Sequence, residues 1–277
     1  MRVLGLALLV ALGMQGAPGD DFYRDFRGQP FDWAEFKVTG PGAANLIKSE
    51  AEGLRITVPA DVKSPVGLVV GFPVKGDFEL TAGYEIIQAD QPAAGYGVGF
   101  EIWLRTDTAT KEATAFSRIV RPSGDDVYVC SRLTTNPQGR RVGIPGLKLP
   151  DFQAAGKSGQ LRIKRTGSEV VLLAADEGNK EFREYYRFEL GAEDIETLRL
   201  AANPGNAANV VDLRVRDFRL RSGDLPAAAK NQEVPKDGKG PTRDRTSLWL
   251  LAALLGAMLV IAGLLMWWRK AGSRAKS

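Results

Sequence analysis

The sequence predicts an all-β domain built as a two-sheet antiparallel β-sandwich. Three observations predict this fold. Short runs with apolar residues at every second position recur between residues 20 and 221, and Gly, Pro, Asp and Asn separate them. Helical periodicity is almost absent, and one helical turn is expected only at residues 191–195. No β-α-β spacing is present, which argues against a parallel sheet.

The first 19 residues predict a secretory signal peptide. Arg2 supplies the positive charge, residues 3–14 form a short apolar core, and small residues follow it. We therefore divide the chain into a signal peptide (1–19), a β-sandwich domain (20–221), a flexible stalk (222–246), a transmembrane helix (247–268) and a basic tail (269–277).

Three long strands are expected within the sandwich. Residues 77–88 and 97–105 alternate cleanly between apolar and polar positions. Residues 210–221 also alternate, but the apolar positions slip by one residue between Val215 and Phe218, which predicts a β-bulge. Shorter strands are expected at residues 54–58, 66–70, 114–120, 127–133, 161–165, 170–174, 187–190 and 197–200. Residues 165–168 (Arg-Thr-Gly-Ser) predict a hairpin turn.

The C-terminal part predicts a membrane anchor. Residues 222–246 are rich in Ala, Pro, Lys, Asp and Gly and show no periodicity, as is typical of a stalk. Residues 248–268 carry no charge, and as a helix they would be about 31 Å long, which matches the hydrocarbon core of a bilayer. Tryptophans stand at both ends, and a basic tail follows.

Together the two ends predict a single-pass protein of the cell membrane. Membrane lipid surrounds residues 248–268, the sandwich lies outside the cytoplasm, and the tail lies inside it. Lys and Arg are balanced on the two flanks, so this orientation rests on the signal peptide. The only cysteine, Cys130, lies in a strand-like run and cannot form a disulfide within the chain.

The distribution of charge argues against a nucleic-acid partner. The whole chain has a net charge of +4. Residues 20–229, however, hold 27 Lys and Arg against 30 Asp and Glu, a net charge of −3. The basic surplus therefore lies in the signal peptide, the stalk and the tail, and the domain has no basic surface of the kind that binds nucleic acid.

Several short motifs carry a family resemblance. They are Asp25-Phe-Arg-Gly, Glu52-Gly-Leu-Arg-Ile, Gly76-Asp-Phe-Glu, Gly95-Tyr-Gly-Val-Gly, Leu161-Arg-Ile-Lys-Arg-Thr-Gly and Asp217-Phe-Arg-Leu-Arg. With the strand pattern, they resemble the concanavalin A-like lectin/glucanase superfamily, and within it an exported planctomycete family, domain of unknown function 1583. The resemblance covers residues 21–221. It implies a jelly-roll fold and brings no activity with it.

The residues give little support to an enzyme, and we expect no catalytic residues. The chain contains no histidine, which excludes Ser-His-Asp and Cys-His nucleophiles and His-ligated zinc. Glycoside hydrolysis needs two carboxylates, and laminarinase-type relatives carry them as Glu-x-Asp-x-x-Glu. The nearest match here is Glu101-Ile-Trp-Leu-Arg, which offers a single acid. A hydrolase with an unrecognised carboxylate pair stays an alternative.

Recognition is the function that the sequence favours. In residues 97–105, one face of the strand is apolar, and the other carries Glu101, Trp103 and Arg105. An aromatic ring beside charged groups suits a sugar, which stacks on the ring and is hydrogen-bonded through its hydroxyls. If neighbouring strands have similar registers, four more residues join this site: Glu85, Arg118, Tyr128 and Arg132.

We therefore predict a membrane-anchored extracytoplasmic recognition module that binds a glycan or an envelope protein. A structural envelope protein without a small ligand is a further alternative. Calcium is conceivable at the turns 176–179 and 203–206, as in other jelly rolls, but neither turn has a specific calcium-binding spacing. No metal or other cofactor is therefore predicted.

Overall fold

The structure is a computed structural model, and it describes residues 20–29, 31, 34–179 and 181–229. All of these belong to the first of the two units into which the chain divides, residues 1–234. No helix among the described residues is long and apolar enough to cross a membrane. The predicted signal peptide, transmembrane helix and basic tail lie outside the described residues, as do residues 230–246 of the predicted stalk.

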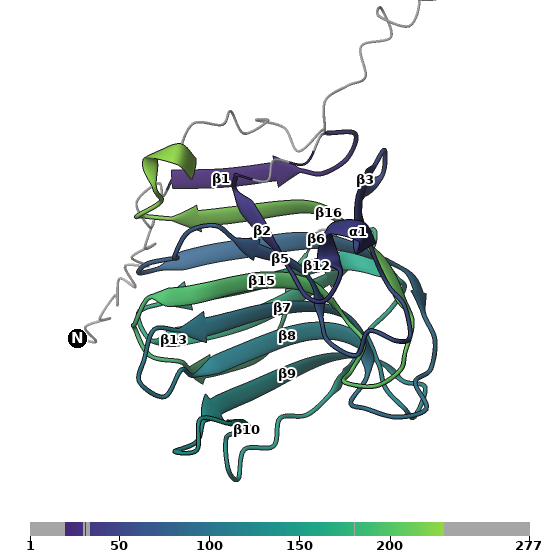
Figure 1. Cartoon of the computed structure of the whole chain (residues 1–277). Helices are drawn as coiled ribbons and strands as arrows, with labels where there is room; N and C mark the ends of the chain where they lie inside the picture. The colour runs from purple at the N-terminus through teal and green to yellow at the C-terminus, as the bar shows by residue number, and fades with distance from the viewer. Residues whose placement is uncertain (1–19, 30, 32–33, 180, 230–277) are drawn as a thin grey trace, which may run out of the picture. The chain divides into compact units, whose positions relative to one another are not determined.

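The described strands form two eight-stranded sheets (Figure 1). The first sheet contains β1 (Asp20–Asp25), β3 (Ile47–Glu50), β4 (Gly53–Val58), β6 (Phe78–Ala89), β12 (Ser158–Thr166), β13 (Glu169–Asp176), β14 (Arg183–Glu189) and β16 (Val211–Ser222). The second sheet contains β2 (Phe36–Thr39), β5 (Val66–Val70), β7 (Val98–Thr106), β8 (Ala113–Val120), β9 (Asp126–Thr135), β10 (Arg141–Gly143), β11 (Phe152–Gln153) and β15 (Ile195–Asn203).

The predicted all-β antiparallel sandwich is confirmed. The first sheet has the order β14-β13-β12-β6-β16-β4-β3, with β1 also on β16. The second has the order β10-β9-β8-β7-β15-β5-β2, with β11 also on β9. Each described pairing is antiparallel. Helices are limited in this part of the chain to α1 (Ala43–Leu46) and the 3-10 turn η1 (Ala227–Ala229).

The core lies between the sheets because each strand turns its alternate apolar residues inward. From β6 and β7, for example, Tyr84 and Phe100 are fully buried, and their rings stack across the sandwich with centroids 5.3 Å apart. A cluster of aromatic rings from β1, β2 and β16 packs within the same core: Phe22, Phe36 and Phe218.

Two local predictions are confirmed. The register of β16 against β6 shifts between Val215 and Asp217, where the slip in periodicity predicted a bulge. The hairpin between β12 and β13 pairs Thr166 with Glu169, and Gly167 adopts a φ of +59° in the turn between them. Glycine suits that position because a positive φ is costly for a residue with a Cβ atom.

The helical turn expected at residues 191–195 does not form. Residues 191–194 are an irregular loop, and Ile195 already begins β15. The backbone groups of Ile195 bond instead to Val74, at 2.8 and 3.1 Å. Because these groups have partners outside the segment, no helical turn is needed to satisfy them.

The domain extends past the boundary we placed at residue 221. Ser222 is the last residue of β16. Leu225 and Ala229, which we assigned to the stalk, are both 2% exposed and belong to the core. Short strands at both edges of the sheets, β1, β2, β3, β10 and β11, were not expected from the sequence pattern.

Candidate ligand-binding face

The central strand of the site is β7, whose residues alternate between the core and the outer face of the second sheet. Phe100, Ile102 and Leu104 belong to the main core. Trp103 belongs to a separate cluster with Ala113 and Ala115, against which Leu133 packs. Glu101, Trp103 and Arg105 therefore share the outer face, as the period of two requires.

The register between strands determines which residues lie beside Glu101, Trp103 and Arg105. On β15, Arg199 lies opposite Trp103 and Ala201 opposite Glu101. On β8, Trp103 faces Ala115, and Arg105 faces Ala113. Because both β8 residues have only a methyl side chain, they leave room for the indole ring to lie over that strand.

Glu101 is held in a hydrogen-bonded cluster and is only 4% exposed. Arg199 Nη2 donates to Glu101 Oε1 at 2.7 Å, and Asn203 Nδ2 donates to Oε2 at 2.6 Å. Asn203 Oδ1 in turn accepts the backbone N–H of Gly205 at 2.9 Å. Both carboxylate oxygens therefore have strong donors, and the carboxylate has a fixed orientation.

Tyr96 adds a second aromatic residue to this cluster. Burial and the nearby charge of Glu101 raise the pKa of Tyr96, and a hydrogen bond with Asn203 opposes this shift. The residue as a whole nevertheless remains 37% exposed. Tyr96 and Arg199 were not predicted at this face, and Asn203 was considered only as part of the candidate calcium turn 203–206. Arg199 and Asn203 share a face of β15, and the polar positions of that strand were the signal that could have revealed them.

The Trp103 ring is covered rather than open. Trp103 as a whole is only 6% exposed. The guanidinium carbon of Arg141, on β10, lies 4.6 Å from the ring centroid, and that of Arg199 lies 5.4 Å away. The open aromatic platform expected from the sequence is therefore occupied by arginine side chains, through cation–π contacts.

Arg105 stands at the end of β7 and is drawn away from the ring cluster by acids. Its Nε lies 3.2 Å from Glu196 Oε2, and Lys111 Nζ lies 3.1 Å from the same oxygen. Lys111 also pairs with Asp107 at 2.8 Å. This part of the face is a small exposed network of charges.

The other four predicted residues do not join this face. Arg118, Tyr128 and Arg132 lie on β8 and β9 at positions that alternate with the outer ones, so they point to the inner side of the sheet. Glu85 lies on the first sheet, where Arg214 and Arg216 each approach it to 3.3 Å. The assumption of similar registers was wrong because neighbouring strands are offset by whole residues, and an offset of one residue reverses the face.

The side chains of Arg118 and Tyr128 make polar contacts inside the sandwich. Arg118 is 1% exposed, donates to the Gly156 carbonyl at 2.8 Å and pairs with Asp126 at 2.8 Å. The Tyr128 hydroxyl donates to Asp176 Oδ1 at 2.6 Å and lies 3.2 Å from the Tyr84 hydroxyl. Burial is the main cause that raises the pKa of Tyr128.

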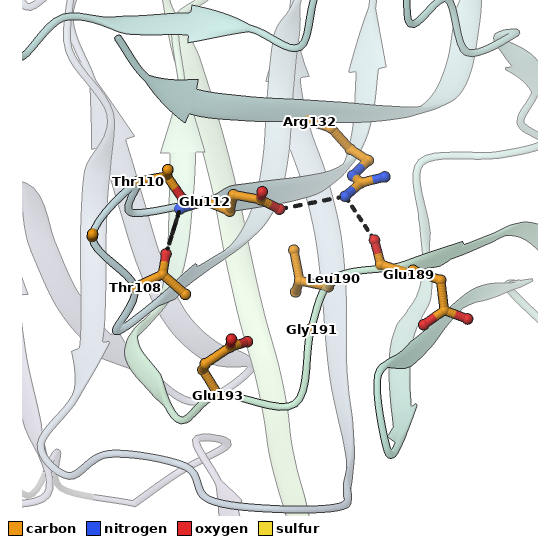
Figure 2. Close-up of a pocket in the computed structure, with 9 residues that line it drawn as sticks. Thr108, Thr110, Glu112, Arg132, Glu189, Leu190, Gly191 and Glu193 are labelled. Atoms are coloured by element: carbon orange, nitrogen blue, oxygen red, sulfur yellow. Dashed lines mark hydrogen bonds and ion pairs between the residues drawn. The ribbon is translucent and has the colours of Figure 1, made fainter. Parts of the chain in front are cut away.

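Arg132 lines a pocket at one end of the sandwich, with a volume of about 520 Å³ (Figure 2). Its Nη2 donates to the carbonyl of Glu189 at 2.7 Å and lies 3.6 Å from Glu112 Oε2. Its guanidinium also stacks on the Phe188 ring, 4.5 Å from the centroid. The other lining residues are Thr108, Ala109, Thr110, Leu190, Gly191 and Glu193.

The loop that forms one wall of this pocket is held at both ends by arginines. Arg132 binds the carbonyl of Glu189, and Arg165 Nη1 donates to the carbonyl of Glu193 at 2.5 Å. Arg165 is 1% exposed, and its Nε also donates to the carbonyl of Gly76 at 2.9 Å. These bonds fix a loop that has no regular secondary structure of its own.

The candidate calcium turns use their side chains for protein contacts. Asn203 binds Glu101 and Gly205, and Asp176 accepts from Tyr128 and from the backbone N–H of Ala155 at 3.2 Å. No group of three or more Asp, Glu or Cys residues suited to a metal ion occurs among the described residues.

The antiparallel pairing and the strand order define the class of protein by its fold: an all-β protein whose two antiparallel sheets pack as a sandwich. Solved structures with similar folds support this assignment. The GH43 protein BlXynB from Bacillus licheniformis, as its K247S mutant, has a TM-score of 0.52 at 10% identity, over 72% of this chain and 39% of that chain. This chain thus spans about two fifths of that protein.

A second structure comes from work on endo-acting O-glycanases that human gut microbiota express to initiate mucin breakdown. It has a TM-score of 0.52 at 14% identity, over 73% of this chain and 98% of that chain. The exoplasmic/lumenal domain of VIP36, bound to Ca²⁺ and mannose, is less similar, with a TM-score of 0.48 at 12% identity, over 75% of this chain and 92% of that chain. At these identities the likeness shows the fold alone.

The particular family follows from the sequence match. Residues 14–236 match the family described as Protein of unknown function (DUF1583) C domain. The chain belongs to this family. None of the curated proteins compared with the chain matches it.

Proposed function

We propose that the sandwich is a carbohydrate-recognition domain that binds a glycan across the outer face of its second sheet. The observation that carries this proposal is the group formed by Trp103, Tyr96, Glu101, Arg199 and Asn203 on that face. Trp103 belongs to a cluster separate from the main core, and Glu101 and Arg199 lie beside it on the outer face of the sheet. A buried ion pair such as Glu101–Arg199 adds little stability in general, and we infer that it is kept for recognition.

The chemistry of the group suits a sugar. A pyranose ring has an apolar face that stacks on an aromatic ring, and its hydroxyls both donate and accept hydrogen bonds. Arg199, whose side chain is 19% exposed, supplies guanidinium donors, and the buried Glu101 and Asn203 hold it in place. Because Arg141 covers Trp103, binding replaces the Arg141–Trp103 contact with a sugar–Trp103 contact, and Arg141 moves to the rim of the bound glycan.

Binding is favoured over hydrolysis on this face. A glycosidase needs two carboxylates roughly 5 to 10 Å apart. Among the described strands of the second sheet, the acid nearest to Glu101 on this face is Glu196, which stands beside Arg105. Arg105 follows Glu101 by four positions on an extended strand, so their backbone positions are about 13 Å apart. Glu196 is also turned towards Arg105 and Lys111.

A glycan array with the purified full-length chain tests the proposal. The chain is kept in detergent because residues 248–268 are predicted to span a membrane. Trp103→Ala is expected to lose at least tenfold in affinity for any glycan that the native chain binds. Phe182→Ala is the matched control, because Phe182 is also stacked under an arginine, Arg162 at 3.7 Å, but Arg162 belongs to β12 of the first sheet. Equal loss from both variants, or none from Trp103→Ala, would rule out this face.

The location of the domain is a second part of the proposal. We propose that the signal peptide and the membrane-spanning segment predicted from the sequence display the sandwich outside the cytoplasm. Protease added to intact cells should then degrade the sandwich and leave a tag at the C-terminus protected. Protection of the sandwich in intact cells, with degradation only after lysis, would contradict this orientation.

Hydrolysis in the end pocket is the one alternative that a specific observation favours. The carboxylates of Glu112 and Glu193 come from different loops and both point into the cavity (Figure 2). Release of reducing sugar from any array ligand, abolished by Glu112→Gln or Glu193→Gln and unaffected by Glu181→Gln, would favour it. Binding without release would favour recognition.

A further inference from the structure

Two arginines, Arg141 and Arg199, stack on Trp103, and a third, Arg105, lies on the same face towards the end of β7; their charges are not equally matched. Arg199 is paired with Glu101 at 2.7 Å, and Arg105 is paired with Glu196 at 3.2 Å. Arg141 stacks on the Trp103 ring at 4.6 Å. Among the described residues, no carboxylate lies within ion-pair distance of Arg141. The face therefore holds one guanidinium in excess of its carboxylates.

The surroundings of Arg141 oppose its charge. Burial lowers the pKa of Arg141, and repulsion from Arg105 and Arg199 lowers it further, with Glu101 acting in the opposite sense. Arg141 lies at the edge of the sheet and is itself exposed, so its long side chain has room to extend into solvent. Instead it lies over the indole, beside two other guanidinium groups.

A bound negative charge would offset the unpaired positive charge of Arg141. A guanidinium presents two parallel N–H donors, which match the two oxygens of a carboxylate or of a sulfate ester. The contact with Trp103 is weak compared with a charge-assisted bidentate hydrogen bond, so an oxyanion would draw Arg141 away from the ring. The same movement would uncover the ring for stacking.

We propose that Arg141 binds an oxyanion on the glycan, so that the ligand of this face is an acidic polysaccharide. This inference rests on the proposed function and names its ligand class. The oxyanion is either a uronic-acid carboxylate or a sulfate ester, since both have the oxygens that a guanidinium recognises. The sugar that carries it stacks on Trp103 while its acidic group lies at the rim.

The net charge of −3 over residues 20–229 does not oppose this proposal. At physiological ionic strength, charges separated by more than about 8 Å on the surface are largely screened. Many of the acids of the domain are paired on the first sheet, for example Asp212 with Arg55 at 2.5 Å and Glu50 with Arg214 at 3.0 Å. The local excess around Trp103 therefore decides the sign of the charge that binds there.

Matched pairs of polysaccharides test the inference on the full-length chain in detergent. One pair is a sulfated galactan and the same galactan after removal of sulfate. The other is polygalacturonate and its fully methyl-esterified form. Titration calorimetry at 0.15 M salt is expected to give at least tenfold tighter binding of the charged member in one pair. The pair that shows the difference identifies the source of the oxyanion.

Two variants separate a specific contact from general attraction. Arg141→Gln is expected to remove the preference for the charged member and to keep binding of the neutral one. Arg140→Gln is the control, because Arg140 is the preceding residue, is exposed, and has no contact with Trp103 among the described contacts. Its preference should equal that of the native chain.

The outcomes distinguish the two proposals. Binding of neutral and charged members with equal affinity in both pairs overturns the inference and leaves the proposed function standing. Equal effects of Arg140→Gln and Arg141→Gln also overturn the inference, because the preference is then unspecific. Failure to bind any of the four polysaccharides, together with an empty glycan array, overturns both.

Discussion

The hydroxyl of Tyr128 donates a hydrogen bond to the carboxylate of Asp176 at 2.6 Å, and this bond joins the two sheets. Tyr128 belongs to β9 of the second sheet, and Asp176 belongs to β13 of the first. Tyr84 extends the network from β6, and the backbone N–H of Ala155 also donates to Asp176. Most of the surrounding core is apolar, so these polar groups depend on one another.

Removing this bond should destabilise the domain. Tyr128→Phe deletes the donor and leaves the Asp176 carboxylate with weaker partners, which should lower the free energy of unfolding by about 1–3 kcal/mol. Urea unfolding followed by fluorescence measures it. Tyr185→Phe is the control, because the Tyr185 ring packs against Tyr128 but its hydroxyl has no hydrogen bond among the described contacts. A similar loss in both variants would show that the hydrogen bond is not the cause.

Stability should fall in alkaline solution. Burial raises the pKa of Cys130 from 9.0 to about 11 and that of Tyr84 from 10.0 to about 12. For each group, at a pH between its lower and its higher pKa, the unfolded chain has lost the proton that the folded chain keeps. Deprotonation therefore favours unfolding, and stability declines as the pH rises above about 9. Urea midpoints from pH 7 to 11 check this. Cys130→Ala should shift the onset upward, and a flat profile would contradict the argument.

Glu101 should matter more to stability than its neighbour Glu196. Glu101→Ala leaves Arg199 and Asn203 without their acceptor in a buried place, which should cost about 2–3 kcal/mol of unfolding free energy. Glu196 has a side chain that is 39% exposed, and Glu196→Ala should cost less than about 1 kcal/mol. Thermal unfolding of both variants measures the difference. Equal costs would mean that Glu101 is not held as described.

Arg165 should keep the pocket loop closed. Arg165→Met removes the donors to the carbonyls of Glu193 and Gly76, so amide hydrogen exchange in residues 190–194 should become at least tenfold faster. Exchange followed by mass spectrometry detects it. Arg162→Met is the control from the same strand, because Arg162 stacks on Phe182 and binds Thr81 on the other face. Unchanged exchange in Arg165→Met would show that the loop is held by other contacts.

The sequence predicted the parts of the fold that depend on local pattern. Alternation over residues 77–88 and 97–105 placed the inner and outer faces of β6 and β7 correctly, because one face of each strand must be apolar. The sequence pattern could not predict which residues lie opposite each other on neighbouring strands. Arg118 and Tyr128 were placed on the wrong face because the offset between neighbouring strands is set by turns and bulges elsewhere in the chain.

The candidate site was predicted only where one strand supplies it. Glu101, Trp103 and Arg105 follow from the periodicity of β7. Arg199 and Asn203 join them from β15, about one hundred residues later in the chain, and a long-range pairing of this kind leaves no local signal. Nor could composition reveal that Arg141 covers Trp103, since β10 is only three residues long.

The outer face of the first sheet lies on the side of the sandwich opposite to Trp103. Arginines there are matched by acids, as in the pairs Arg55–Asp212, Arg214–Glu50 and Arg219–Asp21. A mutually neutralised surface offers little for a ligand to gain. An antibody, a fluorophore or a sensor chip attached on this side would hold the domain with Trp103 turned outward.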